Sequence, residues 1–205
     1  MNILKLLNNV PYRVAAVLIP VIVLILHLAV MYATLPYTLF LTVIGLMVTY
    51  ILPPAGKETV IPLGIALGVP WYYIAFAIAM IDIETGIFMA LNFDLAYKIP
   101  VIGDILITMT EKMQLVITRH RWLTGLNFIA IVLMVLVPFF GSGGIRGSIA
   151  GKLLGLDNYL VFFGILAGTL IGCFGIALGS DAIIGYFCVN GFLPEGISVF
   201  VCNRM

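Results

Sequence analysis

Charged side chains are rare in this chain, and several of them interrupt long apolar stretches. Lys57 and Glu58 follow two prolines, Asp82 and Glu84 lie within a later apolar run, and Arg146 follows a glycine-rich segment. A lone charge in hydrocarbon is unfavourable, so such groups are expected to face inward or to line a wet cavity. Cationic side chains can hold phosphate or carboxylate, and a buried carboxylate can carry a proton.

The segment around Arg146 predicts a site for an anion. Its guanidinium can hold phosphate or carboxylate by two parallel hydrogen bonds. Backbone amides of the glycine-rich segment and the N-terminus of the following helix would add a positive field. The candidate substrate-binding residues are Arg146, Gly141, Ser142, Gly143, Gly144, Lys57 and Glu58, and the candidate proton or charge carriers are Glu58, Asp82 and Glu84.

Each of these candidates has a simpler alternative. Lys57 and Glu58 are adjacent and could neutralise each other, and the glycines could serve only to let helices pack closely. Asp82 and Glu84 are two positions apart, so on one helix they face different directions and at most one is expected in the site. His27, in the first apolar stretch, is expected to satisfy a neighbouring group.

Composition places the chain in a membrane. Of its 205 residues, 63% are hydrophobic and 9% charged, whereas soluble domains carry about 25% charged residues. With a net charge of +1 the chain has no basic stripe for a nucleic acid. No nucleophile–base spacing suggests an enzyme, and no cofactor or metal is expected. The cysteines, Cys173, Cys188 and Cys202, are expected to be buried small hydrophobes.

The pattern of apolar stretches predicts an all-α membrane protein of one domain. An N-terminal transmembrane helix and an interfacial amphipathic helix accompany two repeats, each with a re-entrant hairpin followed by a transmembrane helix. The expected elements are a helix at 14–31, hairpin 1 at 35–69, a helix at 71–92, the amphipathic helix at 94–121, hairpin 2 at 122–156, a helix at 158–180 and a C-terminal membrane segment at 183–202.

Charge distribution orients this arrangement. With the N-terminus in the cytoplasm, the Lys and Arg residues of the N-terminus and of 94–121 lie inside, as the positive-inside tendency requires. Only one helix then separates the hairpins, so they enter from opposite faces. The two copies align with an offset of 87 residues, from Gly68 to Gly155. Inverted repeats with broken helices at mid-depth are typical of transporters.

Two ordered motifs resemble the small multi-drug export protein family, which is related to the DedA (SNARE-associated, VTT) superfamily. They are Ile61-Pro62-Leu63-Gly64 with Leu67-Gly68, and Val137-Pro138 followed by Gly141-Ser142-Gly143, Gly147 and Leu153-Leu154-Gly155-Leu156. The chain departs from the family pattern at Gly56, Glu58 and Phe140. The resemblance implies two opposed re-entrant hairpins and movement of lipids, including polyprenyl phosphates, with proton coupling in some members. Arg146 is similar to the hairpin arginine of DedA proteins.

Together these observations predict a transporter or scramblase of the plasma membrane for an amphiphilic, anionic, lipid-like substrate. Export of cationic hydrophobic drugs and a non-transporting membrane scaffold are the alternatives. The expected partners are a membrane lipid or amphiphilic small molecule. Proton coupling and a homodimer stay open at this point.

Overall fold

The computed structural model describes residues 10–52, 55–96, 127–136, 143–154, 156–191 and 201–202. The regular elements in these ranges are helical. They are α2 (Val10–Thr34), α3 (Tyr37–Ile51), α4 (Lys57–Ala66), α5 (Trp71–Ala96), α7 (Asn127–Leu136), α8 (Gly143–Leu153) and α9 (Asn158–Asn190). The expected amphipathic helix at 94–121 lies outside the described residues, apart from the end of α5.

Three of these helices are long and apolar enough to cross a membrane: Val14–Thr34 within α2, Trp71–Asn92 within α5, and α9. The expectation that the last of these helices ends at residue 180, before a separate segment at 183–202, was wrong. The helix has 33 residues and continues to Asn190. Its backbone stays helical through Gly179-Ser180-Asp181, where a break was expected. The chain turns instead at Gly191, where the positive φ of 67° favours a residue without a Cβ atom. At about 1.5 Å per residue, α9 is about 50 Å long.

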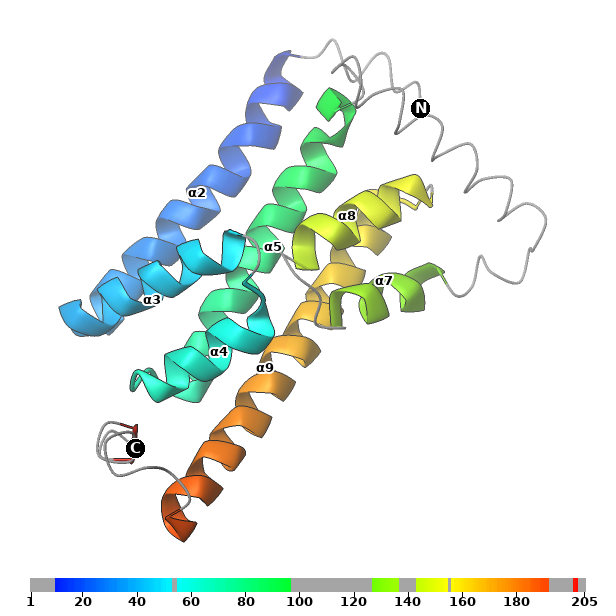
Figure 1. Ribbon diagram of the computed structural model, residues 1–205. Coiled ribbons are helices and arrows are strands. Elements are labelled where there is room, and N and C mark those ends of the chain that lie inside the picture. Colours follow the sequence, from blue (N-terminus) through cyan, green and yellow to red (C-terminus); the bar gives the residue numbers. More distant parts are fainter. Residues whose placement is uncertain are drawn as a thin grey trace.

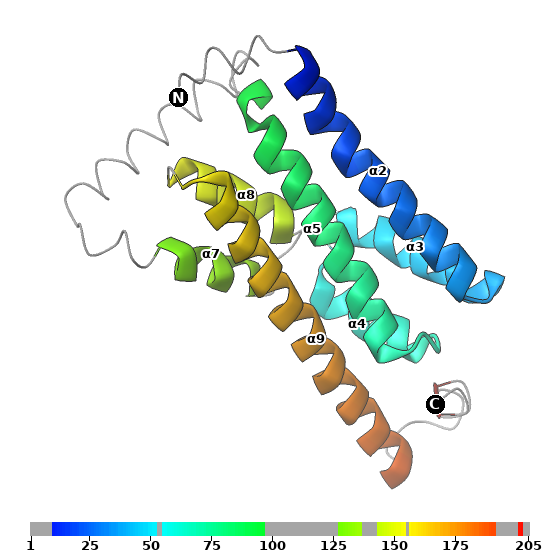
Figure 2. The same ribbon diagram turned by 180° about the vertical axis from the view of Figure 1, so that it is seen from behind.

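The long helices form a layer, and four short helices lie on one face of it. Figures 1 and 2 show α5 crossing α9, with α3 and α4 toward one end of this layer and α7 and α8 toward the other. Prolines mark the limits of the pair α3 and α4, because proline is disfavoured in the interior of a helix. Pro36 precedes α3, and Pro53-Pro54 lies between α3 and α4 in the sequence. The short pairs therefore bring four helix ends toward the crossing of α5 and α9.

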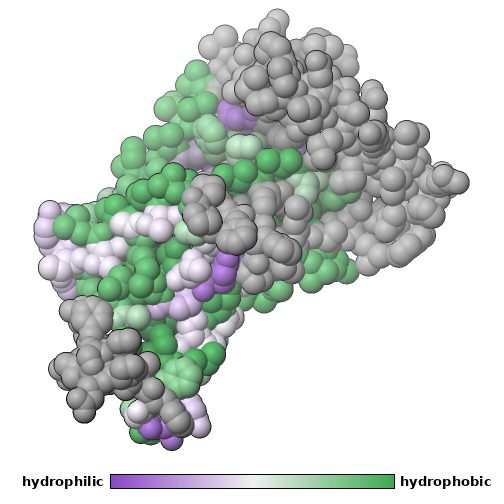
Figure 3. Space-filling view, in the orientation of Figure 1, coloured by the Kyte–Doolittle hydropathy of each residue, from purple (hydrophilic) through white to green (hydrophobic). Residues whose placement is uncertain are grey.

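Apolar side chains cover most of the described surface seen in Figure 3. Large apolar groups such as Leu26, Ile171 and Phe163 are more than half exposed. A soluble monomer rarely shows an apolar surface of this extent. Hydrocarbon is its natural surrounding, as the composition predicted.

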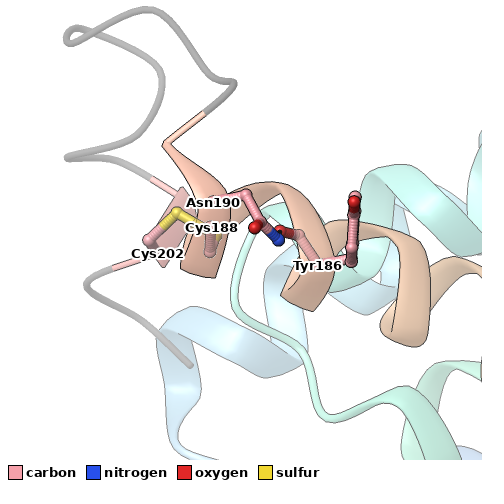
Figure 4. The surroundings of a disulfide bond; sticks show 4 residues. All are labelled: Tyr186, Cys188, Asn190 and Cys202. Atoms are coloured by element: carbon pink, nitrogen blue, oxygen red, sulfur yellow. Dashed lines mark hydrogen bonds between the residues drawn. A yellow bond between two sulfur atoms is a disulfide. The ribbon is translucent and has the colours of Figure 1, made fainter.

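A disulfide joins the end of α9 to the C-terminal segment. Cys188 lies in the last turn of α9 and is bonded to Cys202, with a Cα–Cα distance of 5.6 Å (Figure 4). The expectation that all three cysteines are buried hydrophobes was therefore wrong for these two, and held for Cys173, which is free and buried. The disulfide places Cys202 beside the end of α9, and nothing in the cysteine spacing indicated this pairing.

Candidate functional site

A buried carboxylate lies where four helices meet. Asp82 of α5 has no exposed surface. Its Oδ1 accepts hydrogen bonds from the Tyr50 hydroxyl of α3 at 2.6 Å and from the Gly144 amide of α8 at 3.1 Å. The Thr169 hydroxyl of α9 donates to its Oδ2 at 3.3 Å. These donors, each from a different helix, offset part of the desolvation of a buried negative charge.

The N-terminus of α8 points into this cluster. The Gly143 amide donates to the Tyr50 oxygen at 3.2 Å, beside the bond from the Gly144 amide to Asp82. Free amides and the helix dipole make this end of a helix attractive to anions. Gly143 and Gly144 were expected to bind a substrate anion, and here the Gly144 amide donates to the Asp82 carboxyl group and the Gly143 amide to the Tyr50 oxygen.

A buried cation extends the same region. The Lys57 side chain, 2% exposed, begins α4 and donates a hydrogen bond to the backbone carbonyl of Val135 in α7. The ammonium group also lies against Gly172 of α9. The same Val135 carbonyl borders Gly143, where a Cβ atom would lie 3.3 Å from the Val135 oxygen and 3.0 Å from Asp82 Oδ2. Positive and negative groups thus occupy one buried region between the short helix pairs, which we call the Asp82 cluster (Tyr50, Lys57, Asp82, Gly143, Gly144 and Thr169).

The other acidic candidates lie elsewhere. Glu58 folds back over Gly56 at the start of α4. It does not neutralise Lys57, whose partner is a carbonyl of α7. Glu84 lies on a different face of α5 from Asp82 and contacts His27 of α2, as the two-residue spacing predicted.

Part of the predicted site stays a prediction. Arg146 is in the helical backbone of α8, but its side chain lies outside the described residues, as do Gly141 and Ser142. Lys152, near the end of α8, donates to the Asn158 side chain at an exposed position. It takes no part in the Asp82 cluster.

Glycines permit the close helix contacts that build this cluster. A Cβ atom at Gly144 would overlap the backbone carbonyl oxygen of Asp82, and one at Gly168 would lie 2.7 Å from the Val132 carbonyl oxygen. The Ser148 hydroxyl donates to the Gly86 carbonyl at 2.8 Å, which adds a polar link between α8 and α5. The packing role proposed for the glycines therefore holds at these positions, together with the amide role of Gly143 and Gly144.

An apolar pocket lies about one helical turn along α5 from Asp82. It has a volume of about 230 Å³ and opens between α5 and α9. Gly86 and Ile165 form its inner wall, and both also contact α8. Tyr159 and Phe162 add aromatic surface. Its lining suits an apolar chain or ring.

Sequence reasoning missed Tyr50, Thr169 and the Val135 carbonyl. Tyr50 reads as one more apolar residue of α3, and a backbone carbonyl carries no signal in the sequence. Thr169 had a usable signal, because the 87-residue offset expected from the sequence carries Asp82 onto position 169. Comparing the two copies at each charged position would have drawn attention to it.

The match to known families covers much of this site. The family model described as "Putative small multi-drug export protein" matches residues 58–174. The chain belongs to this family. No curated protein and no solved structure matches it.

The span of the match shows which parts of the chain carry the family pattern. It begins within α4, next to Lys57, and ends within α9, next to Cys173. Asp82, the α8 N-terminus and Thr169 fall inside it, whereas Tyr50 and His27 lie before it. Membership of the small multi-drug export family, with the apolar surface and the three long helices, identifies an integral membrane protein.

Proposed function

We propose that this member of the small multi-drug export family is a proton-coupled membrane transporter of an amphiphile with an anionic headgroup. The observation that carries the proposal is the Asp82 carboxylate, which is fully buried and held by donors from three other helices. Its surroundings offer hydroxyls, amides and an ammonium group, all of them donors. An environment of donors suits an anion.

The mechanism follows from competition for those donors. An ionised Asp82 accepts hydrogen bonds from the Tyr50 hydroxyl and the Gly144 amide. When Asp82 takes up a proton, it loses its charge. Its hydrogen bonds with these donors become weaker, because a neutral acid is a weaker acceptor than a carboxylate. An anionic oxygen of the substrate can then take the place of the carboxylate. One proton enters with one negative charge, so the buried site keeps its net charge and the two move together.

The apolar pocket completes the site for an amphiphile. It lies about one turn along α5 from the carboxylate, and Gly86 and Ile165 of its wall border α8. A headgroup at the Asp82 cluster could therefore place its apolar chain against Phe162 and Tyr159. Lipid-like molecules, including phospholipids and polyprenyl phosphates, have this combination of parts.

The proposal includes two re-entrant hairpins, α3–α4 and α7–α8, related as inverted repeats, as the resemblance to DedA proteins implies. The 87-residue offset carries the start of α5 at Trp71 onto the start of α9 at Asn158. It also carries Lys57 onto Gly144, and Thr85 onto Gly172. A Cβ atom at Gly144 would lie 3.0 Å from the Thr85 hydroxyl, and one at Gly172 would lie 3.1 Å from the Lys57 ammonium. Matching contacts of this kind support a pseudo-twofold relation.

Export of cationic hydrophobic drugs is the second candidate. It is favoured by the name of the family and by the aromatic side chains of Tyr159 and Phe162 in the pocket, since aromatic faces attract cations. In this case the cation would replace the proton on Asp82. Substrate and proton would then move in opposite directions.

The direction of proton flow separates these candidates. Purified protein in liposomes containing a pH-sensitive dye would be given a fluorescent short-chain phosphatidylglycerol or ethidium. We expect phosphatidylglycerol to cross the bilayer and to carry protons in the same direction. Proton movement opposite to ethidium would support the drug exporter instead. Failure of both probes to move above protein-free liposomes would contradict transport and favour the scaffold.

We also propose that α9 ends on the extracytoplasmic side and that the N-terminus is cytoplasmic. Disulfides persist in oxidising compartments, and the Cys188–Cys202 bond lies at this end of α9. The C-terminal end of α2 and the start of α5 lie toward the same side as this end of α9 (Figure 1). Residues 98–121, rich in Lys and Arg, then fall on the cytoplasmic side, as the sequence predicted.

Thiol labelling in intact cells tests this orientation. A membrane-impermeant maleimide is expected to label Cys188 and Cys202 only after treatment with a membrane-impermeant reductant. A Lys98→Cys variant that lacks the native cysteines is the matched control, and should be labelled only after the membrane is permeabilised. Labelling of Lys98→Cys in intact cells would reverse the proposed orientation.

A further inference from the structure

A second buried polar contact lies between α2 and α5, away from the Asp82 cluster. The two helices run side by side in opposite directions (Figures 1 and 2). Near one end the Asn92 amide donates to the Ala16 carbonyl at 3.0 Å, and near the other the Thr34 and Tyr73 hydroxyls are 2.7 Å apart. Between these contacts, His27 Nδ1 lies 3.0 Å from Glu84 Oε1. The helices are thus joined on both sides of the His27–Glu84 pair.

The pair is buried and incompletely hydrogen-bonded. Both residues are 5% exposed. His27 Nε2 and Glu84 Oε2 are buried, and neither has a hydrogen-bond partner in the part of the chain that the structure describes. Buried polar atoms are normally satisfied, so two such atoms on one contacting pair require a physical explanation. Each of these atoms can bind a proton.

Neighbouring charged groups do not account for the pair. Asp82, on the same helix, is held by α3, α8 and α9. Lys57 of α4 donates to α7, and the Tyr73 hydroxyl of α5 is engaged with Thr34. The ring of Phe76, an apolar group, meets the His27 ring edge to face, with centroids 6.1 Å apart. Among the described side chains, His27 and Glu84 therefore form an ionisable unit of their own.

We propose that His27 and Glu84 form a proton-binding site, separate from the Asp82 cluster, through which pH controls how firmly α2 is held against α5. With one proton between them, the pair is neutral overall. A second proton leaves an imidazolium beside a neutral acid. Removal of the shared proton leaves a carboxylate beside a neutral imidazole. Either change places an uncompensated charge between two apolar helices, where it weakens their contact.

Nitrogen NMR of the histidine ring tests proton binding directly. The chain has two histidines, so a His120→Asn background leaves His27 as the single ring signal. We expect its ¹⁵N shifts to change as the pH is varied, because each ring nitrogen can bind a proton. In Glu84→Gln the midpoint should move by about one pH unit or more, because strongly coupled groups titrate together. Asp82→Asn should leave the midpoint in place, since the two sites are separate.

Thermal unfolding tests the effect on helix packing. We expect the unfolding temperature of the wild type to pass through a maximum as pH is varied, and the maximum to be lost in the His27→Leu, Glu84→Leu double variant. Each single variant should unfold at a lower temperature than the double variant, because each leaves one buried polar partner alone.

Each outcome bears on the proposal without reference to transport. A His27 signal that is constant with pH, or a midpoint unaffected by Glu84→Gln, would overturn proton binding by the pair. A shift of the midpoint in Asp82→Asn equal to that in Glu84→Gln would overturn the separation of the two sites. If the wild-type protein moves no probe across the bilayer but its His27 signal still depends on pH and on Glu84, the result would count against the proposed function alone.

Discussion

Asp82→Asn is expected to abolish proton-coupled transport while leaving the fold intact. Asparagine has almost the same shape as aspartate. Its carbonyl oxygen can still accept hydrogen bonds from Tyr50 and Gly144, and its amide can donate to the Thr169 oxygen. It can neither take up nor release a proton, so the proton-driven change between holding and releasing the Gly144 amide is lost. We expect transport at the level of protein-free liposomes and a change in unfolding free energy of no more than about 1 kcal/mol.

Two further variants make this result interpretable. Asp157→Asn removes a carboxylate at an exposed position before α9 and should transport normally. Asp82→Ala leaves the hydroxyls of Tyr50 and Thr169 and the Gly144 amide without their acceptor, at a cost of about 1–3 kcal/mol for each unpaired group. It should therefore lose stability as well as transport. Full proton-coupled transport by Asp82→Asn would contradict a proton-carrying role for this residue.

The main fold could be predicted because lipid imposes simple requirements. Hydrocarbon demands long apolar helices, and α2, α5 and α9 appear at 14–31, 71–92 and 158–180 in the sequence pattern with only their ends misplaced. Pro53-Pro54 and the glycines before α8 marked the breaks between the short helices. The end of α9 was misplaced because Gly179-Ser180-Asp181 reads as a turn. A helix already stabilised along its length by packing tolerates these residues.

The site was only partly predictable, since its charges were visible and its partners were not. Burial of Asp82 and Lys57 follows from their positions in apolar stretches. Which atoms they meet depends on the crossing of α5 with the short helices, and these contacts join residues 32 to 87 positions apart. The pairing of His27 with Glu84 across 57 positions has the same origin. Periodicity gives the face of a residue but not the neighbour on that face.

The disulfide was missed for a different reason. An odd number of cysteines in apolar surroundings gives no pairing by itself, and Cys173 shows that the buried interpretation can hold for one of three. Cys188 and Cys202 nevertheless pair beside the end of α9, which stops at Gly191. A glycine in a left-handed conformation ends α9 there, and the sequence does not show which of the 21 glycines of this chain takes that role.

Gly144→Ala is expected to cause the largest loss of stability among the glycine variants of α8. The new methyl group would overlap the backbone carbonyl oxygen of Asp82 and would lie 2.8 Å from the carbonyl carbon. A backbone atom cannot move aside as a flexible side chain can, so α8 must shift away from α5. We expect a loss of about 3 kcal/mol in unfolding free energy, at the upper end for overpacking. Reversible unfolding in mixed detergent micelles would measure it.

Gly175→Ala is the matched control on α9, where a Cβ atom would meet nothing within 4 Å. Alanine is the better helix former by about 1 kcal/mol, so this variant should be as stable as the wild type or slightly more so. The displaced α8 in Gly144→Ala would also carry the Gly144 amide away from Asp82 and weaken the hydrogen bond that joins the helices. Transport should therefore fall together with stability. Equal stability of the two variants would contradict the close approach of α8 to α5, on which the geometry of the Asp82 cluster depends.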